Sequence, residues 1–102
     1  MVKLIALYSK PANAESFEQH YRNVHMPLAA RMPGLRKTVL GWVRGSPMGE
    51  ARYHLVAELY FDSHEALKAA MKSPEGAAAA KDLMGFAGEL VHLLVADVQE
   101  LN

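Results

Sequence analysis

The chain has five histidines and no cysteine, so imidazole is the side chain best suited to proton transfer near neutral pH. His25 is the leading catalytic candidate because it lies two residues before Pro27, in a segment with helical spacing. A proline removes a backbone hydrogen bond from a helix and disturbs the preceding turn, where a cleft can form. His25 has a structural alternative, in which it bonds a carbonyl group that Pro27 leaves without a donor. The residues alone leave both roles open.

Tyr21 is a candidate binding residue because it precedes His25 by one helical turn, so the two side chains can meet. It is placed to orient the imidazole or to donate a hydrogen bond to a substrate oxygen. Tyr21 also belongs to an apolar stripe with Phe17, Val24 and Leu28, and core packing is therefore its alternative role.

Further candidate binding residues lie on predicted strands: Trp42, His54, Glu58, Tyr60 and His92. His54, Glu58 and Tyr60 alternate along one strand and are expected to share a face. An acidic group in an apolar cavity can serve as acid or base, but Glu58 equally suits a solvated face or a subunit interface. Trp42 and Tyr60 can line an aromatic pocket for a flat ligand or pack between subunits. His92 is a satisfied core histidine or a group that approaches His25 across the cavity.

Motifs for metal and cofactor binding are missing from the sequence. There is no HExxH motif, no close His-x-His pair, no phosphate-binding loop and no GxGxxG or GxSxG motif. We therefore expect no metal and no cofactor. His20 and His64 are expected at the surface, and Asp82 with Phe86, four residues later, is expected to anchor the second helical region.

The elements that must position these residues follow from hydrophobic periodicity. Short apolar or alternating segments predict strands at 2–8, 35–45, 52–61 and 90–98. Helical spacing predicts helices at 13–30 and 62–84; the first is kinked or restarted near His25, and the second restarts at Ser73-Pro74. The order β-α-β-β-α-β predicts an α+β, ferredoxin-like fold with a four-stranded antiparallel sheet and helices on one face. The length fits one domain, residues 1–102.

The charge balance excludes some classes of partner. Eleven basic and eleven acidic residues give a formal net charge of zero, so we expect neither nucleic-acid binding nor attachment to an anionic membrane surface. The apolar stretch at the N-terminus is too short and too alternating for a signal peptide or a membrane span. A cytoplasmic protein is the resulting expectation.

Both faces of the predicted sheet carry apolar residues. On strand 52–61 one face is free of charge and is expected to pack on the helices, while the face of Glu58 and Tyr60 mixes apolar with titratable side chains. Such a mixed face suits a partly buried cavity. The last strand is largely apolar on both sides, so we expect the bare sheet faces of two subunits to pack in a homodimer.

The first helix carries a recognisable pattern, Phe17-x3-Tyr21-x3-His25-x-Pro27, followed by Leu28 and Met32-Pro33-Gly34-Leu35. This pattern resembles the signature of the EthD family. The segment 58–63 and Asp82-x3-Phe86 support the resemblance, which spans nearly the whole chain. It implies a dimeric α/β barrel. Members are associated with ethyl tert-butyl ether degradation gene clusters, relatives act as dehydratases or decarboxylases, and the wider superfamily includes cofactor-independent monooxygenases and muconolactone isomerases.

Two functions remain open at this point. In the first, a cavity between sheet and helices binds a small hydrophobic or aromatic compound, and His25 transfers a proton in a lyase, isomerase or cofactor-free oxygenase reaction. In the second, the same cavity belongs to a non-catalytic binding or accessory protein of a catabolic pathway. Haem binding, which occurs in distant members of the superfamily, is a third and weaker alternative.

Overall fold

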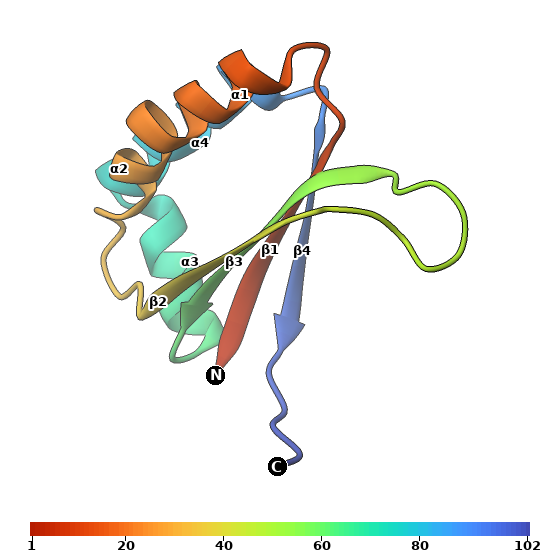
Figure 1. Cartoon of the computed structure of the whole chain (residues 1–102). Helices are drawn as coiled ribbons and strands as arrows, with labels where there is room; N and C mark the ends of the chain where they lie inside the picture. The colour runs from red at the N-terminus through yellow and green to blue at the C-terminus, as the bar shows by residue number, and fades with distance from the viewer.

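The computed structural model describes residues 1–102 as a four-stranded sheet with helices on one face (Figure 1). The elements are β1 (Val2–Ser9), α1 (Ala14–His20), η1 (Tyr21–His25), α2 (Met26–Ala29), β2 (Lys37–Trp42), β3 (Tyr53–Phe61), α3 (His64–Lys72), α4 (Pro74–Ala87) and β4 (Val91–Asp97). All strand pairs are antiparallel, in the order β2-β3-β1-β4. The predicted ferredoxin-like α+β fold is confirmed.

The core lies between the sheet and the helices. Alternate residues of β1 are buried there, and Ala6 and Tyr8 pair across the ladder with Ala57 and Leu55 of β3. This is the charge-free face that the alternation in β3 predicted. Phe61 at the end of β3 is fully buried. Replacing a buried aromatic residue of this kind by alanine typically costs about 3–5 kcal/mol, so this face supplies much of the stability of a small domain.

The first helical region differs from the sequence prediction in its middle. It continues past His25, but residues 21–25 form a π-helical turn in which the Met26 N–H donates to the Tyr21 carbonyl. In an α-helix the ring of Pro27 would clash with the carbonyl four residues earlier. The wider turn lies immediately before this position, where a regular α-helix is most strained. The predicted disturbance is therefore a π-turn, a feature frequent at functional sites.

The π-turn also changes which side of the helix is buried. The predicted stripe included Val24, but 41% of this residue is exposed. The buried positions are four residues apart at Phe17, Tyr21, His25 and Ala29. Extra residues in the wide turn rotate the following positions, so His25 replaces Val24 on the core side.

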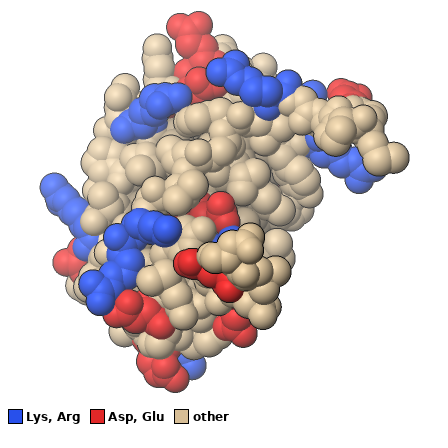
Figure 2. Space-filling model, turned by 60° about the horizontal axis from the view of Figure 1, so that its bottom comes forward, with Lys and Arg blue, Asp and Glu red and all other residues tan.

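The helix-free face of the sheet is partly apolar and partly charged. Glu58 forms an ion pair with Lys3, and the Tyr60 ring lies beside the amino groups of Lys3 and Lys37. Large apolar side chains are exposed here as well, and Leu94 retains 52% of its accessible surface. Basic and acidic side chains are interspersed in the view of Figure 2 and form no patch of one sign.

No helix has the length and apolar composition needed to cross a membrane.

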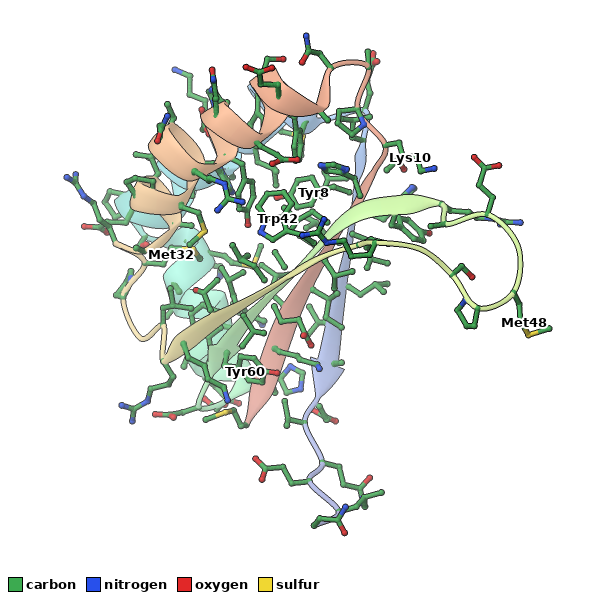
Figure 3. The ribbon with its side chains drawn as sticks, in the orientation of Figure 1. Tyr8, Lys10, Met32, Trp42, Met48 and Tyr60 are labelled. Carbon is green, nitrogen blue, oxygen red and sulfur yellow. The ribbon has the colours of Figure 1, made fainter.

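The segment between β2 and β3 extends away from the helices and the rest of the sheet (Figure 1). Met48 lies at its tip, whereas Tyr8 and Trp42 lie in the space between the sheet and the first helix (Figure 3). The projecting segment is therefore separate from the aromatic residues that surround His25.

Candidate functional site

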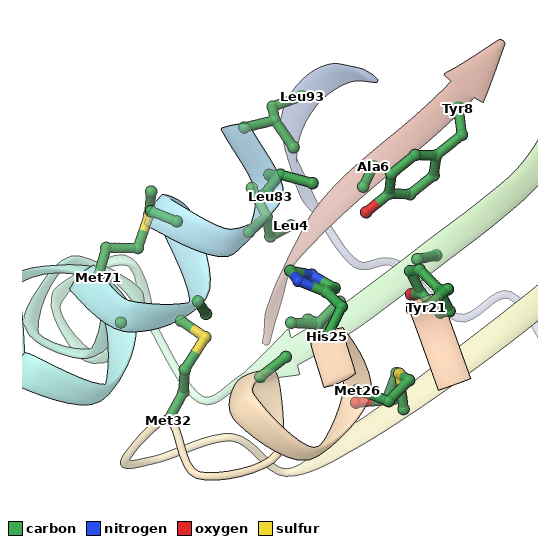
Figure 4. A pocket seen from close by; sticks show the side chains of 17 residues that line it. Leu4, Ala6, Tyr8, Tyr21, His25, Met26, Met32, Met71, Leu83 and Leu93 are labelled. Atoms are coloured by element: carbon green, nitrogen blue, oxygen red, sulfur yellow. The ribbon is translucent and has the colours of Figure 1, made fainter. Parts of the chain in front are cut away.

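A cavity of about 100 Å³ lies between the sheet and the helices (Figure 4). Most of its lining is aliphatic, including three methionines, Met26, Met32 and Met71. The polar side chains in the lining are His25, Tyr8, Tyr21 and Thr38. An engineered apolar cavity of about 150 Å³ holds benzene. This cavity is somewhat smaller, but flexible methionine side chains allow it to widen.

His25 is buried in the lining and is paired with a carboxylate. Its Nδ1 lies 3.1 Å from Oδ2 of Asp82, in α4. A carboxylate only accepts hydrogen bonds, so the Nδ1 atom of His25 carries the proton and donates it. Nε2 has no hydrogen-bond partner in the protein, and no buried side-chain nitrogen or oxygen is left unsatisfied. The unprotonated nitrogen of neutral His25 is therefore available to a ligand.

Asp82 is held in place by a second histidine. His20 Nε2 lies 2.9 Å from Oδ1 of Asp82 and 3.2 Å from Oδ2. The exposed fraction of the side chain falls from 34% at His20 to 16% at Asp82 and 9% at His25. The Phe86 ring lies against both imidazoles, with ring centroids 4.3 Å from His20 and 5.3 Å from His25. Two histidines from the first helical region thus hold the carboxylate of α4 in place.

The π-turn explains why two histidines five residues apart reach one carboxylate. In an α-helix, at about 100° per residue, such positions point roughly 140° apart. The wider turn, whose hydrogen bonds span five residues, brings positions five apart close to the same side. His20 and His25 bracket this turn. A regular α-helical spacing, assumed from the sequence, does not predict this arrangement. Asp82 was expected only to anchor its helix, but it is the partner of both imidazoles.

Burial lowers the pKa of His25 below its ordinary value of about 6.5. The hydrogen bond and the negative charge of Asp82 oppose this effect, and the nearby His20 adds to it. His25 is therefore neutral at pH 7, as a base must be before it accepts a proton.

Stability should depend on pH because of His25. Its pKa is lower in the folded than in the unfolded chain, so between these values the unfolded state binds more protons and the free energy of unfolding rises with pH. We expect stability to be lost as the pH falls below about 6.5, and His25→Gln to flatten this dependence. Urea unfolding as a function of pH measures it. Equal slopes in wild type and His25→Gln would contradict the prediction.

The phenols of Tyr8 and Tyr21 stay protonated. Burial raises the pKa of Tyr8, with Tyr21 and Asp82 adding to the shift, and burial raises the pKa of Tyr21 to about 12. Their ring centroids are 5.6 Å apart, and the Tyr21 ring lies 5.5 Å from that of His25. Figure 4 shows the three side chains at one end of the cavity. The predicted contact between Tyr21 and His25 is thus present.

Trp42 and His54 lie beside this site, outside the cavity lining. The β1–β3 ladder shifts at His54, since Tyr8 pairs with Leu55 and Ser9 with Tyr53. A bulge re-aims side chains, and here the His54 ring meets Phe17 and Trp42, while its Nε2 lies 3.0 Å from Glu18 in α1. The expectation that His54 shares a face with Glu58 and Tyr60 is therefore wrong.

Three other sequence candidates lie away from His25. Glu58, Tyr60 and His92 alternate with the core residues and project from the helix-free face of the sheet. The cavity is on the opposite face, so His92 does not approach His25 across it. The mixed face was expected to suit a cavity, but the helices enclose one only on the charge-free side. No group of three or more His, Asp or Glu side chains is arranged to hold a metal ion.

Residues 10–89 match the model of the EthD domain. The chain belongs to the EthD family. A solved EthD family protein from Bacillus halodurans C-125 is 46% identical, with a TM-score of 0.94 over 97% of this chain and 99% of that chain. An uncharacterised 11.0 kDa protein from the thcB-thcC intergenic region of Rhodococcus erythropolis is 31% identical over 97 residues, which are 95% of this chain and 94% of the relative.

More distant solved structures share the EthD fold at low identity. The hydroxynitrile lyase of Passiflora edulis is 16% identical, with a TM-score of 0.77 over 99% of this chain and 95% of that chain. A protein from Thermobifida fusca described as dimeric and ferredoxin-like is 16% identical, with a TM-score of 0.71 over 95% of this chain and 90% of that chain. At this identity the likeness concerns the fold alone.

Proposed function

We propose that this EthD protein abstracts a proton from a small, uncharged carbonyl compound or a similarly weak acid, with His25 as the general base. The observation that carries the proposal is the buried His25–Asp82 pair, 3.1 Å between Nδ1 and Oδ2, in the wall of an apolar cavity. The pair leaves Nε2 of His25 free to accept the proton. The carboxylate then stabilises the imidazolium that forms.

Tyr8 and Tyr21 complete the proposed chemistry. Proton abstraction next to a carbonyl places negative charge on the carbonyl oxygen, and hydrogen-bond donors stabilise this charge. Because their pKa values are raised, both phenols remain donors at neutral pH. They lie on the same side of the cavity as His25 (Figure 4). A neutral base and protonated donors in one apolar cavity are the combination that enolate formation requires.

The lining limits the substrate to uncharged molecules. It contains no lysine, arginine, aspartate or glutamate, so a charged substrate would lose its hydration without gaining a partner. The structural neighbour from Passiflora edulis is a lyase, and lyase chemistry is compatible with a buried general base.

Exchange of hydrogen for deuterium tests the proposal, because it reports proton abstraction whatever product is formed. Uncharged carbonyl compounds of four to eight heavy atoms, about the size that the cavity admits, are incubated with the protein in D₂O and followed by NMR. We expect deuterium to enter beside the carbonyl group, and His25→Gln to slow this exchange by about 10²–10⁴-fold, the usual contribution of general acid–base catalysis.

An exchange rate that is unchanged in folded His25→Gln would show that His25 is not the general base. Compounds that raise the melting temperature of both proteins without exchange would instead establish the second function, a non-catalytic binding protein.

We also propose that the protein is a homodimer through the helix-free faces of its sheets. The exposed Val39 and Leu94 on this face favour a covered surface, and the neighbour from Thermobifida fusca is described as dimeric. Lys3 and Glu58 neutralise each other there, so their charges do not prevent two copies from meeting.

Leu94→Arg should convert the dimer into a monomer, because two-fold packing would bury the added charge twice without a partner. We expect the wild-type mass in sedimentation to be twice 11.2 kDa and the variant mass to be 11.2 kDa. Met48→Arg, at the tip of the projecting segment, is the control and should leave the mass unchanged. A monomeric wild type at micromolar concentration would contradict the dimer.

A further inference from the structure

The cavity has two unlike ends. His25, Tyr8 and Tyr21, which form the polar end, are all buried. Only three lining residues are largely exposed to solvent, namely Met71, Ala80 and Leu93. Met71 retains 45% and Leu93 42% of its accessible surface. Figure 4 shows Met71 and Leu93 on the side of the cavity away from Tyr8 and Tyr21.

These three residues come from elements that meet at one edge of the fold. Met71 lies in the last turn of α3, Ala80 lies in α4, and Leu93 lies in β4, an edge strand of the sheet. Leu93 pairs with Ala6, which lines the cavity floor, so the side chain of Leu93 is on the helix side of the sheet. The helices leave this strand incompletely covered, and the cavity reaches the surface there.

We propose that the opening between α3, α4 and β4 is the route by which substrate reaches His25, and that Met71 and Leu93 limit its width. The proposal rests on the proposed function for the identity of the substrate, but the route itself can be tested without turnover. Three small residues of α4 line this opening: Gly76, Ala79 and Ala80. Two large apolar residues, Met71 and Leu93, stand at its exposed rim. The route therefore admits narrow or flat uncharged molecules and excludes charged or bulky ones.

The absence of cysteine makes a direct test available, because one introduced thiol is the only thiol in the chain. Ala79→Cys places it in the cavity wall, and Ala77→Cys places it on the exposed side of the same helix. Iodoacetamide and iodoacetate are similar in size, but only iodoacetate is charged. We expect the labelling rate at position 79, divided by the rate at position 77, to be at least about tenfold greater with iodoacetamide, since an ion loses hydration on entry.

Variants at the rim locate the entrance. Met71→Trp and Leu93→Trp, each made in the Ala79→Cys protein, should slow labelling by iodoacetamide about tenfold or more, because access then requires local opening. Met84→Trp is the matched control: Met84 is exposed on α4 but does not line the cavity, so the rate should not change. Thr38→Cys, also in the lining, is a second reporter if Ala79→Cys does not fold.

Unchanged labelling in both rim variants would overturn the route, and equal normalised labelling by the two reagents would overturn the exclusion of charged molecules. Neither result depends on catalysis. Failure of the route is therefore distinguishable from failure of His25 as a base, which only the deuterium exchange reports.

Discussion

Asp82→Asn is expected to abolish most proton transfer by His25 while leaving the fold intact. The hydrogen bond and charge of Asp82 raise the pKa of His25 against the effect of burial, so their loss lowers that pKa further. The amide of asparagine can also donate to Nδ1, which favours the tautomer with its proton on Nε2. That tautomer cannot accept a proton from a ligand in the cavity. We expect about 10²–10⁴-fold slower deuterium exchange, a loss of about 3–5 kcal/mol of transition-state stabilisation.

Nitrogen NMR of the imidazole provides a second measurement that needs no substrate. Wild-type His25 should be protonated at Nδ1, and Asp82→Asn should shift the proton toward Nε2. The control is Asp97→Asn, because Asp97 forms a similar 2.9 Å contact with His64 on the surface and does not line the cavity. Wild-type tautomer and wild-type exchange in Asp82→Asn would show that the carboxylate only anchors α4.

The order of strands and helices along the chain and the core face of the sheet could be predicted because each rests on a local pattern. Alternation along β3 predicted a core face of Tyr53, Leu55, Ala57, Leu59 and Phe61, and the last four are buried. Tyr53, which lies on the other side of the bulge, is only partly buried. Ser73 and Pro74 likewise predicted the restart of the second helical region, where the Ser73 side chain accepts a hydrogen bond from the Gly76 N–H. Such signals need only the residue types and their neighbours in sequence.

The site was predicted less completely because two local irregularities decide its geometry. The π-turn before Pro27 turns His25 inward and Val24 outward, and a fixed period of 3.6 residues cannot anticipate that rotation. The bulge at His54 moves that side chain to the helix side of β3, which strict alternation excludes. Asp82 was underrated for a different reason: its partners lie 57 and 62 residues away in sequence.

Ala79→Leu is expected to remove ligand binding without removing the base. Ala79 is buried in the cavity wall, and leucine adds three carbon atoms to a space of about 100 Å³. In wild type, an uncharged ring compound such as cyclohexanone at about 100 times its Kd should stabilise the fold by about 2.7 kcal/mol, which raises Tm by roughly 10–20 °C. In the variant this shift should disappear. Ala77→Leu adds the same atoms on the exposed side of α4 and should retain the shift.

Ala79→Leu and His25→Gln together distinguish ligand binding in the cavity from proton abstraction by His25. His25→Gln keeps the cavity, so ligands should still raise its Tm although deuterium exchange is lost. Ala79→Leu keeps the His25–Asp82 pair, so its imidazole tautomer should match wild type although both binding and exchange are lost. A ligand that stabilised Ala79→Leu as strongly as wild type would bind elsewhere, and the general base would then have no substrate in its cavity. Exchange that survived in Ala79→Leu would likewise place the reacting molecule outside the space beside Ala79.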